Sequence, residues 1–514
     1  MKKTRIAGIA VVLSAFLIIF NSCKKDFDTI NQNPNSAGLD KAAPDMLLTS
    51  AIESMTDRVQ ETFLGEEMGN CWAQHEAKVQ YTDEDRYIYR TSVVNNTWAS
   101  FYAANGMDVA TLYNVAVAKQ HKNYQGVALV LKSYISSVLT DLFGPIPYTQ
   151  AWLGAENTLP VYDSQESIYR DMIAKLDEAN TLLDVNGKAI AGDILYNNDI
   201  SKWKKFANSL RMRLLLRMSG RDAAFVTAEF TKMVVTYPAT YPIFVSNADN
   251  AALQYLGSAP NNHPMNENRK TRDDHRVSNT LVDMMWTNSP NLDYRICIYA
   301  DQDANNTFEG MPNGLTSSQA ASYNGNGIKY TSKVGSWFTG VHNDGLTAPG
   351  MLMSFAELKF ILAEAAFKGY FPGIAENYYY EGIYGSYAQF GDALVAAVDG
   401  YGYLPMADAT SDSLAADYIA NDIYGWVAVN GMELIATQRW AATYDQGLQS
   451  WFEWRRTGFP VLTPAIAGMN GGKIPVRVPY PTDEAARNPS SLAGGVSLLG
   501  GADDLNTRVW WDMP

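Results

Sequence analysis

MSFAELKFILAEAAFKGYFPGIAENYYYEGIYGSYAQFG, residues 353–391, is the stretch that decides the fold class. Its first half carries an apolar stripe at the spacing of one helix face: Phe355, Leu358, Leu362 and Ala365. The stripe ends at Gly369, Phe-Pro-Gly at 371–373 turns the chain, and residues 375–390 continue as a second helix. A helix, a short turn and a second helix form a helical hairpin, so this stretch predicts a mostly α fold.

Helical periodicity also runs from Pro44 to the break at Tyr237. Within it, Asp163 followed by Glu166 predicts the start of a helix, in a variant of the capping box. Residues 237–350 differ, because they are rich in Asn, Gly, Ser and Pro and contain only short extended segments. Loops of that length inside a folded domain are usually functional or disordered. We therefore expect helical hairpins with a loop-rich, small-β insert that forms the ligand face.

The first residues have the layout of a secretory signal. Three cationic residues (Lys2, Lys3 and Arg5) precede an apolar run at 6–20. This run is shorter than the roughly 20 residues that a membrane-spanning helix needs. We therefore predict a signal peptide over residues 1–22.

Cys23 follows the small residue Ser22, as in a lipoprotein signal, although Phe20 and Asn21 depart from the commonest lipobox. We expect Cys23 to be acylated and residues 23–41 to form a polar tether, with one domain over 42–514. More than one acyl chain gives stable anchoring on a membrane. The alternative is an ordinary cleaved signal with an incidental cysteine.

The composition narrows the classes of partner. A formal net charge of −14 argues against nucleic acid, whose affinity for proteins comes largely from Lys and Arg on phosphates. Only Cys71 and Cys297 remain besides Cys23, which is neither a disulfide framework nor a zinc spacing. We expect both to be small buried residues, with pairing left open.

No catalytic constellation stands out in the sequence, which has no HExxH, GxSxG or phosphate-binding loop. The adjacent acids Glu66 with Glu67, and those at 83–85, are expected to be solvated faces. The segment 301–305 alternates like the start of a calcium loop, but it lacks the glycine at position six and the glutamate at position twelve. We predict no cofactor, and leave a structural calcium ion open.

Aromatic residues carry the strongest hint of binding, with 30 Tyr, 12 Trp and 19 Phe. Their rings offer flat apolar faces with a polar handle, which suits stacking on sugars or gripping peptide side chains. The polar segment NNHPMNENRKTRDDHR at 261–276 adds arginines and amides. Six side chains are predicted to converge on one shallow ligand-binding site: Trp72, Tyr81, Asn262, Arg269, Tyr323 and Trp337. Opposite placement of Trp72 and Trp337 would contradict this.

Several blocks of the chain resemble the SusD/RagB outer-membrane lipoproteins of Bacteroidetes, in particular the SusD-like subgroup. After the signal comes CKKDFDTINQNPN, and the later blocks are LTDLFGPIPYTQAW at 139–152, PVYDSQESIYRDMIAKLDEA at 160–179, DISKWKKFANSLRMRLLLRMSG at 199–220, MSFAELKFILAEAAFKG at 353–369, YYYEGIYGSYAQFG at 378–391, ATQRWAATYDQGLQSWFEWRRTGFP at 436–460, IPVRVPYP at 474–481 and VWWD at 509–512. One departure is Tyr294 between Asp293 and Arg295, where the family usually has Pro.

The resemblance implies tetratricopeptide-like hairpins beneath a loop-rich face. It also implies a cell-surface lipoprotein of the outer membrane, which acts as the lid of a SusC-like TonB-dependent transporter. The implied ligand is a nutrient glycan and the protein is not an enzyme. Peptide capture by the same mechanism is the alternative, and a surface glycoside hydrolase is a further one. The blocks themselves look like scaffold: Glu357 and Glu364 are expected to pair with Arg455 and Arg456.

Overall fold

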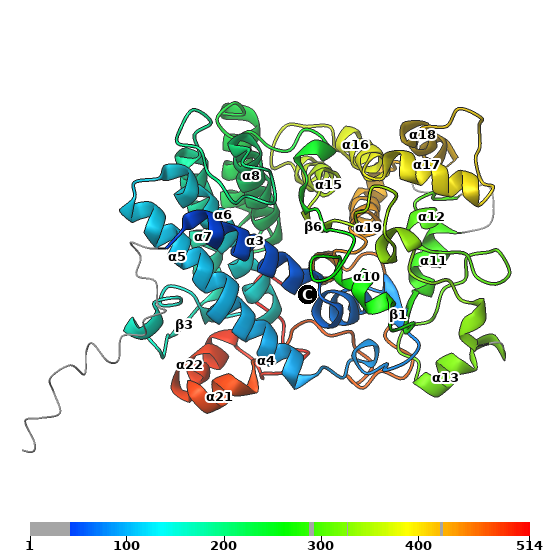
Figure 1. Cartoon of the computed structure of the whole chain (residues 1–514), viewed down its shortest axis with the longest axis horizontal. Helices are drawn as coiled ribbons and strands as arrows, with labels where there is room; N and C mark the ends of the chain where they lie inside the picture. The colour runs from blue at the N-terminus through cyan, green and yellow to red at the C-terminus, as the bar shows by residue number, and fades with distance from the viewer. Residues whose placement is uncertain (1–41, 287–291, 326, 422–424, 514) are drawn as a thin grey trace, which may run out of the picture. The chain divides into compact units, whose positions relative to one another are not determined.

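Helices dominate the residues that the computed structural model describes, which are 42–286, 292–325, 327–421 and 425–513 (Figure 1). The predicted mostly α fold with a small-β insert is confirmed. The predicted signal peptide, Cys23 and the tether lie outside the described residues.

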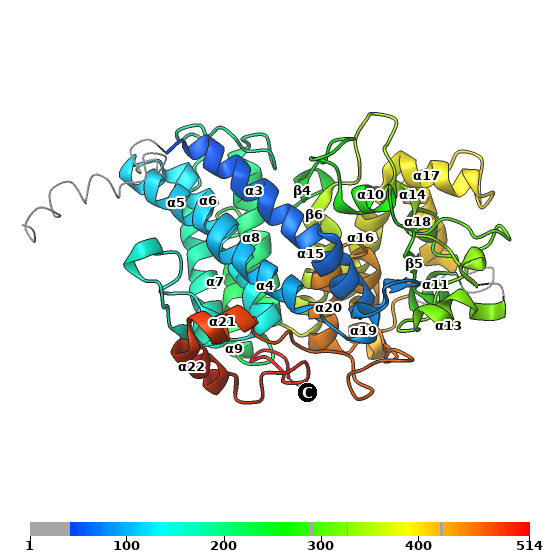
Figure 2. The ribbon, with the colours of Figure 1, turned by 60° about the horizontal axis from the view of Figure 1, so that its bottom comes forward.

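The first half is a row of helices in which α5, α6, α7 and α8 each lie beside the next (Figures 1 and 2). α3 and α4 lie along the same group in both views. The helices of this half are α3 Pro44–Gln60, η1 Thr62–Asn70, η2 Glu84–Arg86, α4 Thr91–Ala99, η3 Ser100–Ala104, α5 Asn105–Ala118, α6 Lys122–Phe143, η4 Gly154–Glu156, α7 Gln165–Leu182, α8 Ile200–Arg217, α9 Ala223–Phe230 and η5 Thr231–Thr236.

The second half begins with the hairpin that the sequence predicts, formed by α15 and α16. α19 packs on α15, and α20 packs on both α19 and η1. The helices of this half are α15 Phe355–Phe367, α16 Ala375–Ala388, α17 Gly391–Gly400, α18 Ser411–Asn421, η9 Ala428–Asn430, α19 Gly431–Ala442, α20 Gly447–Thr457, α21 Thr482–Arg487 and α22 Pro489–Leu499.

Helix α15 lies between two hydrophobic cores. Leu358, Ile361 and Leu362 belong to a large core that includes residues of α3 to α9. Ala356 and Phe360, on its other side, belong to a second core that includes residues of the insert and of α16 to α19. Because α15 has apolar residues on two sides, it is buried against both cores and joins the two halves.

The insert between the halves contains short elements and little regular sheet. Three two-stranded antiparallel sheets occur in the described chain, pairing β1 with β5, β2 with β3 and β4 with β6. Their strands are β1 Glu76–Lys78, β2 Ile146–Pro147, β3 Tyr162–Asp163, β4 Ala251–Leu253, β5 His275–Val277 and β6 Gly350–Met353. The short helices here are η6 Asn247–Asp249, α10 Pro264–Arg269, α11 Asn279–Met285, α12 Ile296–Tyr299, α13 Ser317–Ala321, η7 Tyr323–Gly325, η8 Gly327–Tyr330 and α14 Ser336–Thr339.

Among the helices of the described residues, α6 is the longest; it is apolar and long enough to cross a bilayer, but 94% of its most apolar 18 residues are buried inside the fold. α6 is therefore a core helix of this domain, since its neighbours α5 and α7 cover it.

The N-terminal cap of helix α7 lies one residue later than the sequence pattern predicts. Its cap is Ser164, whose side chain accepts a hydrogen bond from the backbone N–H of Ser167. The prediction that Asp163 caps this helix is wrong, because the Asp163 carboxylate instead accepts the backbone N–H groups of Tyr148 and Thr149.

Near the end of the described chain, Trp511 is 1% exposed and belongs to the large core. Its indole Nε1 donates to Asp141 Oδ1 on α6 at 2.7 Å. The guanidinium carbon of Arg455 lies 4.6 Å from the Trp511 ring centre and 4.3 Å from that of Trp451. Arg455 therefore joins α20 to the last residues by cation–π contacts.

Candidate functional site

The pairing of β1 with β5 brings two distant loop segments together. Lys78 lies opposite His275, and the backbone N–H of Val79 donates to Asp274 O at 2.8 Å. The strands are antiparallel, so residues just after β1 lie next to those just before β5. In this position the Arg272 guanidinium carbon lies 5.0 Å from the ring centre of Tyr81. We call Tyr81 and Arg272 the platform.

Tyr81 is an unusual residue for this position. Its side chain is 61% exposed, and its backbone φ of +51° lies in the left-handed region. Left-handed backbone costs energy for a residue with a side chain, and residues held this way cluster at functional positions. A large aromatic ring kept in solvent, with a cation over it, is a suitable surface for a ligand to contact.

Four adjoining hollows run past the platform, with volumes of about 410, 820, 360 and 700 Å³. The first and second share Glu53 as a lining residue. The second and third share Thr271 and Arg272, and the third and fourth share Gln80 and Tyr81. Neighbouring hollows share lining residues, so the four adjoin in a row, which we call the trough.

Acidic side chains gather at one end of the trough. At the end next to α3, Glu53, Asp57 and Glu61 follow one another at four-residue spacing and line the first two hollows. Burial raises the pKa of all three carboxyls, and mutual repulsion contributes to the shift of Glu53. The second hollow also has an apolar wall, which includes Phe63 and Pro260.

Two of the six predicted ligand residues line the trough. Tyr81 borders the third and fourth hollows, and Asn262 borders the second. Arg269 lies beside it, paired with Asp273 at 2.6 Å, and Asp273 lines the third hollow. Asn262 is 5% exposed and donates to Asn266 and Glu267, so most of its hydrogen-bonding capacity is already used.

The other three residues do not line these hollows. Trp72 has no exposed surface, packs edge-on against Trp451 at 5.0 Å and donates to Glu84 O. Its predicted ligand contact is therefore not supported, because its indole is part of the core. Trp337 is half-buried against Phe338 and Phe390 in the second core.

Tyr323 packs on a small cluster that contains Ala77 and Met311. The structure thus brings together Tyr81, Asn262 and Arg269, but not Trp72, Tyr323 or Trp337.

The sequence-based prediction of the site did not include the acids of α3 or the contact between Arg272 and Tyr81. The four-residue spacing of Glu53 and Asp57 places two carboxylates on one face of α3, with Glu61 just after its last residue, and this signal was available in the sequence. The pairing of Arg272 with Tyr81 was not available, since it depends on two strands 197 residues apart.

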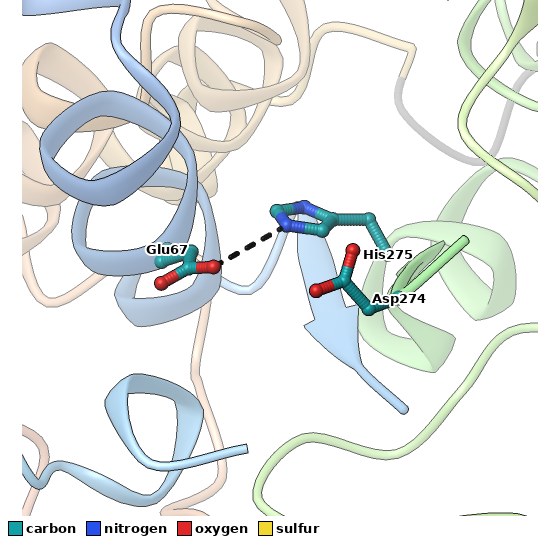
Figure 3. A group of neighbouring side chains, drawn as sticks. All are labelled: Glu67, Asp274 and His275. Atoms are coloured by element: carbon teal, nitrogen blue, oxygen red, sulfur yellow. Dashed lines mark ion pairs between the residues drawn. The ribbon is translucent and has the colours of Figure 1, made fainter. Parts of the chain in front are cut away.

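Beneath the platform lies a buried group of ionisable side chains, which we call the Lys78 site (Figure 3). The Lys78 ammonium donates to Glu67 Oε1, to Asp274 Oδ2 at 3.1 Å, and lies 3.2 Å from His275 Nε2. Burial alone would raise the pKa of Glu67, but His275 and Lys78 outweigh it and lower that pKa to about 2. Glu67, Asp274 and His275 offer ligand atoms that lie within 4.8 Å of one another.

A second buried group, the carboxyl cluster, comprises Glu66, Glu76 and Asp445. Asn70 Nδ2 donates to Glu66 Oε2 at 2.6 Å and to Glu76 Oε1 at 3.1 Å. Burial raises the pKa of Glu76 to about 8 and that of Asp445 to about 7. These groups therefore hold protons near neutral pH.

The expectation that the adjacent acids are solvated faces is wrong for most of them. Glu66, Glu67, Glu84 and Asp85 are all at most 2% exposed. In the segment that resembles a calcium loop, Asp303 Oδ1 accepts the N–H groups of Asn305 and Thr307. That oxygen therefore holds the loop itself, whereas Asp303 Oδ2 is buried without a hydrogen-bond partner among the described residues.

Comparison with known proteins agrees with this architecture. The SusD-like_2 family, described as "Starch-binding associating with outer membrane", matches residues 34–481. No curated protein sequence matches the chain.

Among solved structures, one called a chitin-binding protein is 25% identical, with a TM-score of 0.78 over 92% of this chain and 100% of its own. A SusD homolog from Bacteroides fragilis is 24% identical, with a TM-score of 0.76 over 92% of this chain and 99% of its own. A chitin-binding SusD homolog from Flavobacterium johnsoniae is 24% identical, with a TM-score of 0.73 over 91% of this chain and 98% of its own. Because the family match spans most of the sequence and the fold agrees, this chain belongs to the SusD-like_2 family.

Proposed function

We propose that this protein captures a nutrient glycan in the trough and delivers it to a SusC-like TonB-dependent transporter of the outer membrane. The observation that carries the proposal is the exposed Tyr81 with Arg272 above it, in the middle of four adjoining hollows. The family description names starch binding, and a related structure is called chitin-binding, which supports a glycan as ligand class.

The shape of the trough fits a chain better than a single sugar. Small-molecule sites are usually one enclosed cavity of about 300–1,000 Å³. Here several hollows of that size adjoin in a row, and the platform stands between the second and fourth of them. A ligand with repeating units would fill successive hollows and cross the Tyr81 ring.

We further propose that residues 1–22 are a cleaved signal, that Cys23 is lipidated and that 23–41 tether a single domain, residues 42–514, to the cell surface. The family's association with the outer membrane supports this location. The role we assign is binding without catalysis. A glycosidase needs two carboxyl groups flanking one bond, whereas the acids of α3 line one side of the trough at successive turns of a helix.

Isothermal titration of the mature protein against malto-oligosaccharides, chito-oligosaccharides and short peptides tests the proposal. We expect saturable binding of one oligosaccharide class, with the ligand unchanged afterwards. Tyr81→Ala should weaken it at least about tenfold, or roughly 1.4 kcal/mol. Tyr237→Ala is the matched control, because Tyr237 is 55% exposed and does not line the trough.

The other outcomes each have a meaning. Binding of peptides alone would transfer the same capture role to peptide ligands. Cleavage of the oligosaccharide during the titration would show an enzyme. Equal affinity in wild type and Tyr81→Ala would remove the platform from the ligand site.

A further inference from the structure

Lys78 is a fully buried lysine whose ammonium group uses each of its three N–H donors on a different side chain. The acceptors are Glu67 Oε1, Asp274 Oδ2 at 3.1 Å and His275 Nε2 at 3.2 Å. His275 Nε2 thus faces the same point between the three side chains as the two carboxylate oxygens do.

The three acceptors have the chemistry of metal ligands. One imidazole nitrogen and two carboxylates suit zinc or manganese, and their ligand atoms lie within 4.8 Å of one another. Each of the three residues is more than nine-tenths buried. Asp274 Oδ1 is also buried and has no hydrogen-bond partner among the described residues. One carboxylate oxygen of this group therefore still lacks a donor after Lys78 has made its contacts.

The second hydrogen-bonding partner of His275 is also typical of a metal-binding histidine. Its other ring nitrogen, Nδ1, lies 2.9 Å from Glu76 Oε2. A histidine that binds a metal ion through one nitrogen usually donates the other N–H to a carboxylate, which fixes the ring and its tautomer. His275 has this second partner, and a lysine ammonium stands where the metal ion would be.

We propose that Lys78 takes the place of a structural metal ion, and that Glu67, Asp274 and His275 form a latent divalent-metal site which zinc or manganese occupies once the ammonium is removed. The resident cation joins η1, which carries Glu67, to the start of β5. It also neutralises two carboxylates that would otherwise face each other in the protein interior. Figure 3 shows the three side chains Glu67, Asp274 and His275.

The position of this cation gives it a structural task. Lys78 ends β1, and Asp274 and His275 begin the paired stretch of the opposite strand. Asp274 Oδ2, which accepts from Lys78, also lies 3.9 Å from Arg272. The Lys78 site thus fixes the base of the two segments that carry the platform. This inference concerns the cation alone and does not depend on which ligand the trough binds.

Lys78→Ala is the variant that tests the proposal, by thermal unfolding and by titration with zinc chloride or manganese chloride. In EDTA we expect its Tm to fall by at least about 5 °C, because Glu67 and Asp274 lose the buried ammonium that lies between them, and Glu67 keeps only Arg90 at 3.2 Å. Added zinc or manganese should raise that Tm again and bind at one ion per chain. Wild type should show neither response, because the ammonium occupies the position.

Two controls make the response specific. Lys132→Ala removes another lysine, whose ammonium lies over the rings of Tyr148 and Trp152 with no such triad around it, and it should gain no metal response. The double variant Lys78→Ala with Asp274→Asn should lose the metal response, because one ligand is gone.

The result that overturns the proposal is a folded Lys78→Ala protein that binds neither metal, or a wild type that binds them equally well. If Lys78→Ala does not fold in EDTA, the proposal requires that refolding with zinc or manganese recovers the native circular dichroism spectrum. Lys78→Met, which preserves most of the side-chain volume, provides the second variant. Failure of metal to rescue both variants would also overturn it.

Discussion

Two buried groups of ionisable residues, one among the scaffold helices and one formed by the carboxyl cluster, differ in the number of cations that lie beside their acids. The scaffold group, which we call the arginine network, contains four arginines and four carboxylates: Arg213, Arg217, Arg439, Arg456, Asp141, Glu357, Glu364 and Glu453. The carboxyl cluster contains three acids, and its nearest hydrogen-bonding partners are the amide of Asn70 and the His275 imidazole.

The difference appears in the protonation of the acids. In the arginine network, arginine charges outweigh burial and lower the pKa of Glu357 and, to about 2, that of Glu364. In the carboxyl cluster, burial dominates and raises the pKa of Glu76 to about 8 and that of Asp445 to about 7. Burial alone therefore does not decide whether an acid is charged; the number of cations placed beside it does.

The largest expected effect comes from unbalancing the arginine network. Arg213 is 1% exposed and its Nε donates to Glu357 Oε1 at 2.7 Å. Arg213→Met should lower the unfolding free energy by about 3–5 kcal/mol, because it leaves a buried carboxylate short of a partner. Urea unfolding measures this.

A double replacement sharpens that result. Arg213→Met combined with Glu357→Leu removes both partners and should recover part of the lost stability, since the buried carboxylate is gone and Arg439, its other partner, keeps Glu453 at 2.9 Å. A single variant that loses less than about 1 kcal/mol would mean that the network is not a major source of stability.

A smaller, pH-dependent effect is expected from the carboxyl cluster. The folded-state pKa of Glu76, about 8, is raised above its ordinary value of 4.5, so the folded protein keeps a proton that the unfolded chain releases. The stability from this proton is fully present below pH 4.5 and is lost as pH rises through 8. Between pH 6 and pH 9 we expect wild type to lose roughly 1–3 kcal/mol, and Glu76→Gln to lose less.

Glu364→Gln is the matched control from the arginine network. The folded-state pKa of Glu364 is lowered to about 2, so its contribution is present above pH 4.5 and disappears only as pH falls toward 2. Between pH 6 and 9 this variant should be less stable than wild type by a constant amount. Equal slopes for wild type and Glu76→Gln would mean that Glu76 does not hold the proton.

The smallest effect is expected at an exposed ion pair. Arg487 lies 3.6 Å from Asp483 on α21, and its side chain is 80% exposed. Arg487→Ala should change the unfolding free energy by less than about 0.5 kcal/mol, because solvent screens the pair. A loss comparable to that of Arg213→Met would mean that burial is not what distinguishes these pairs.

The sequence predicts the helical hairpins well because their signal is local. The stripe of Leu358 and Leu362, and the turn at 371–373, need only neighbouring residues to be recognised, and α15 and α16 form there. Ion pairing is harder, since it depends on partners from distant helices. Arg456 pairs with Glu364 as expected, but Arg455 donates to backbone carbonyl groups instead.

The ligand residues are harder still, because polarity is a poor guide to exposure in this chain. Trp72 lies in a polar stretch, which made it look like part of a surface loop. Yet its neighbours His75, Glu76 and Lys78 are themselves at most 1% exposed. Two of their partners lie far away in the sequence: Trp440 is 365 residues from His75, and His275 is 197 residues from Lys78. No local pattern could have shown that these polar groups satisfy one another in the interior.

The burial of Trp511 against α6 has a consequence for the order of events during biosynthesis. Asp141 receives its indole partner only after some 370 further residues have been made. This contact of the large core therefore forms only once the residues around Trp511 have been synthesised, and any shorter nascent chain lacks it.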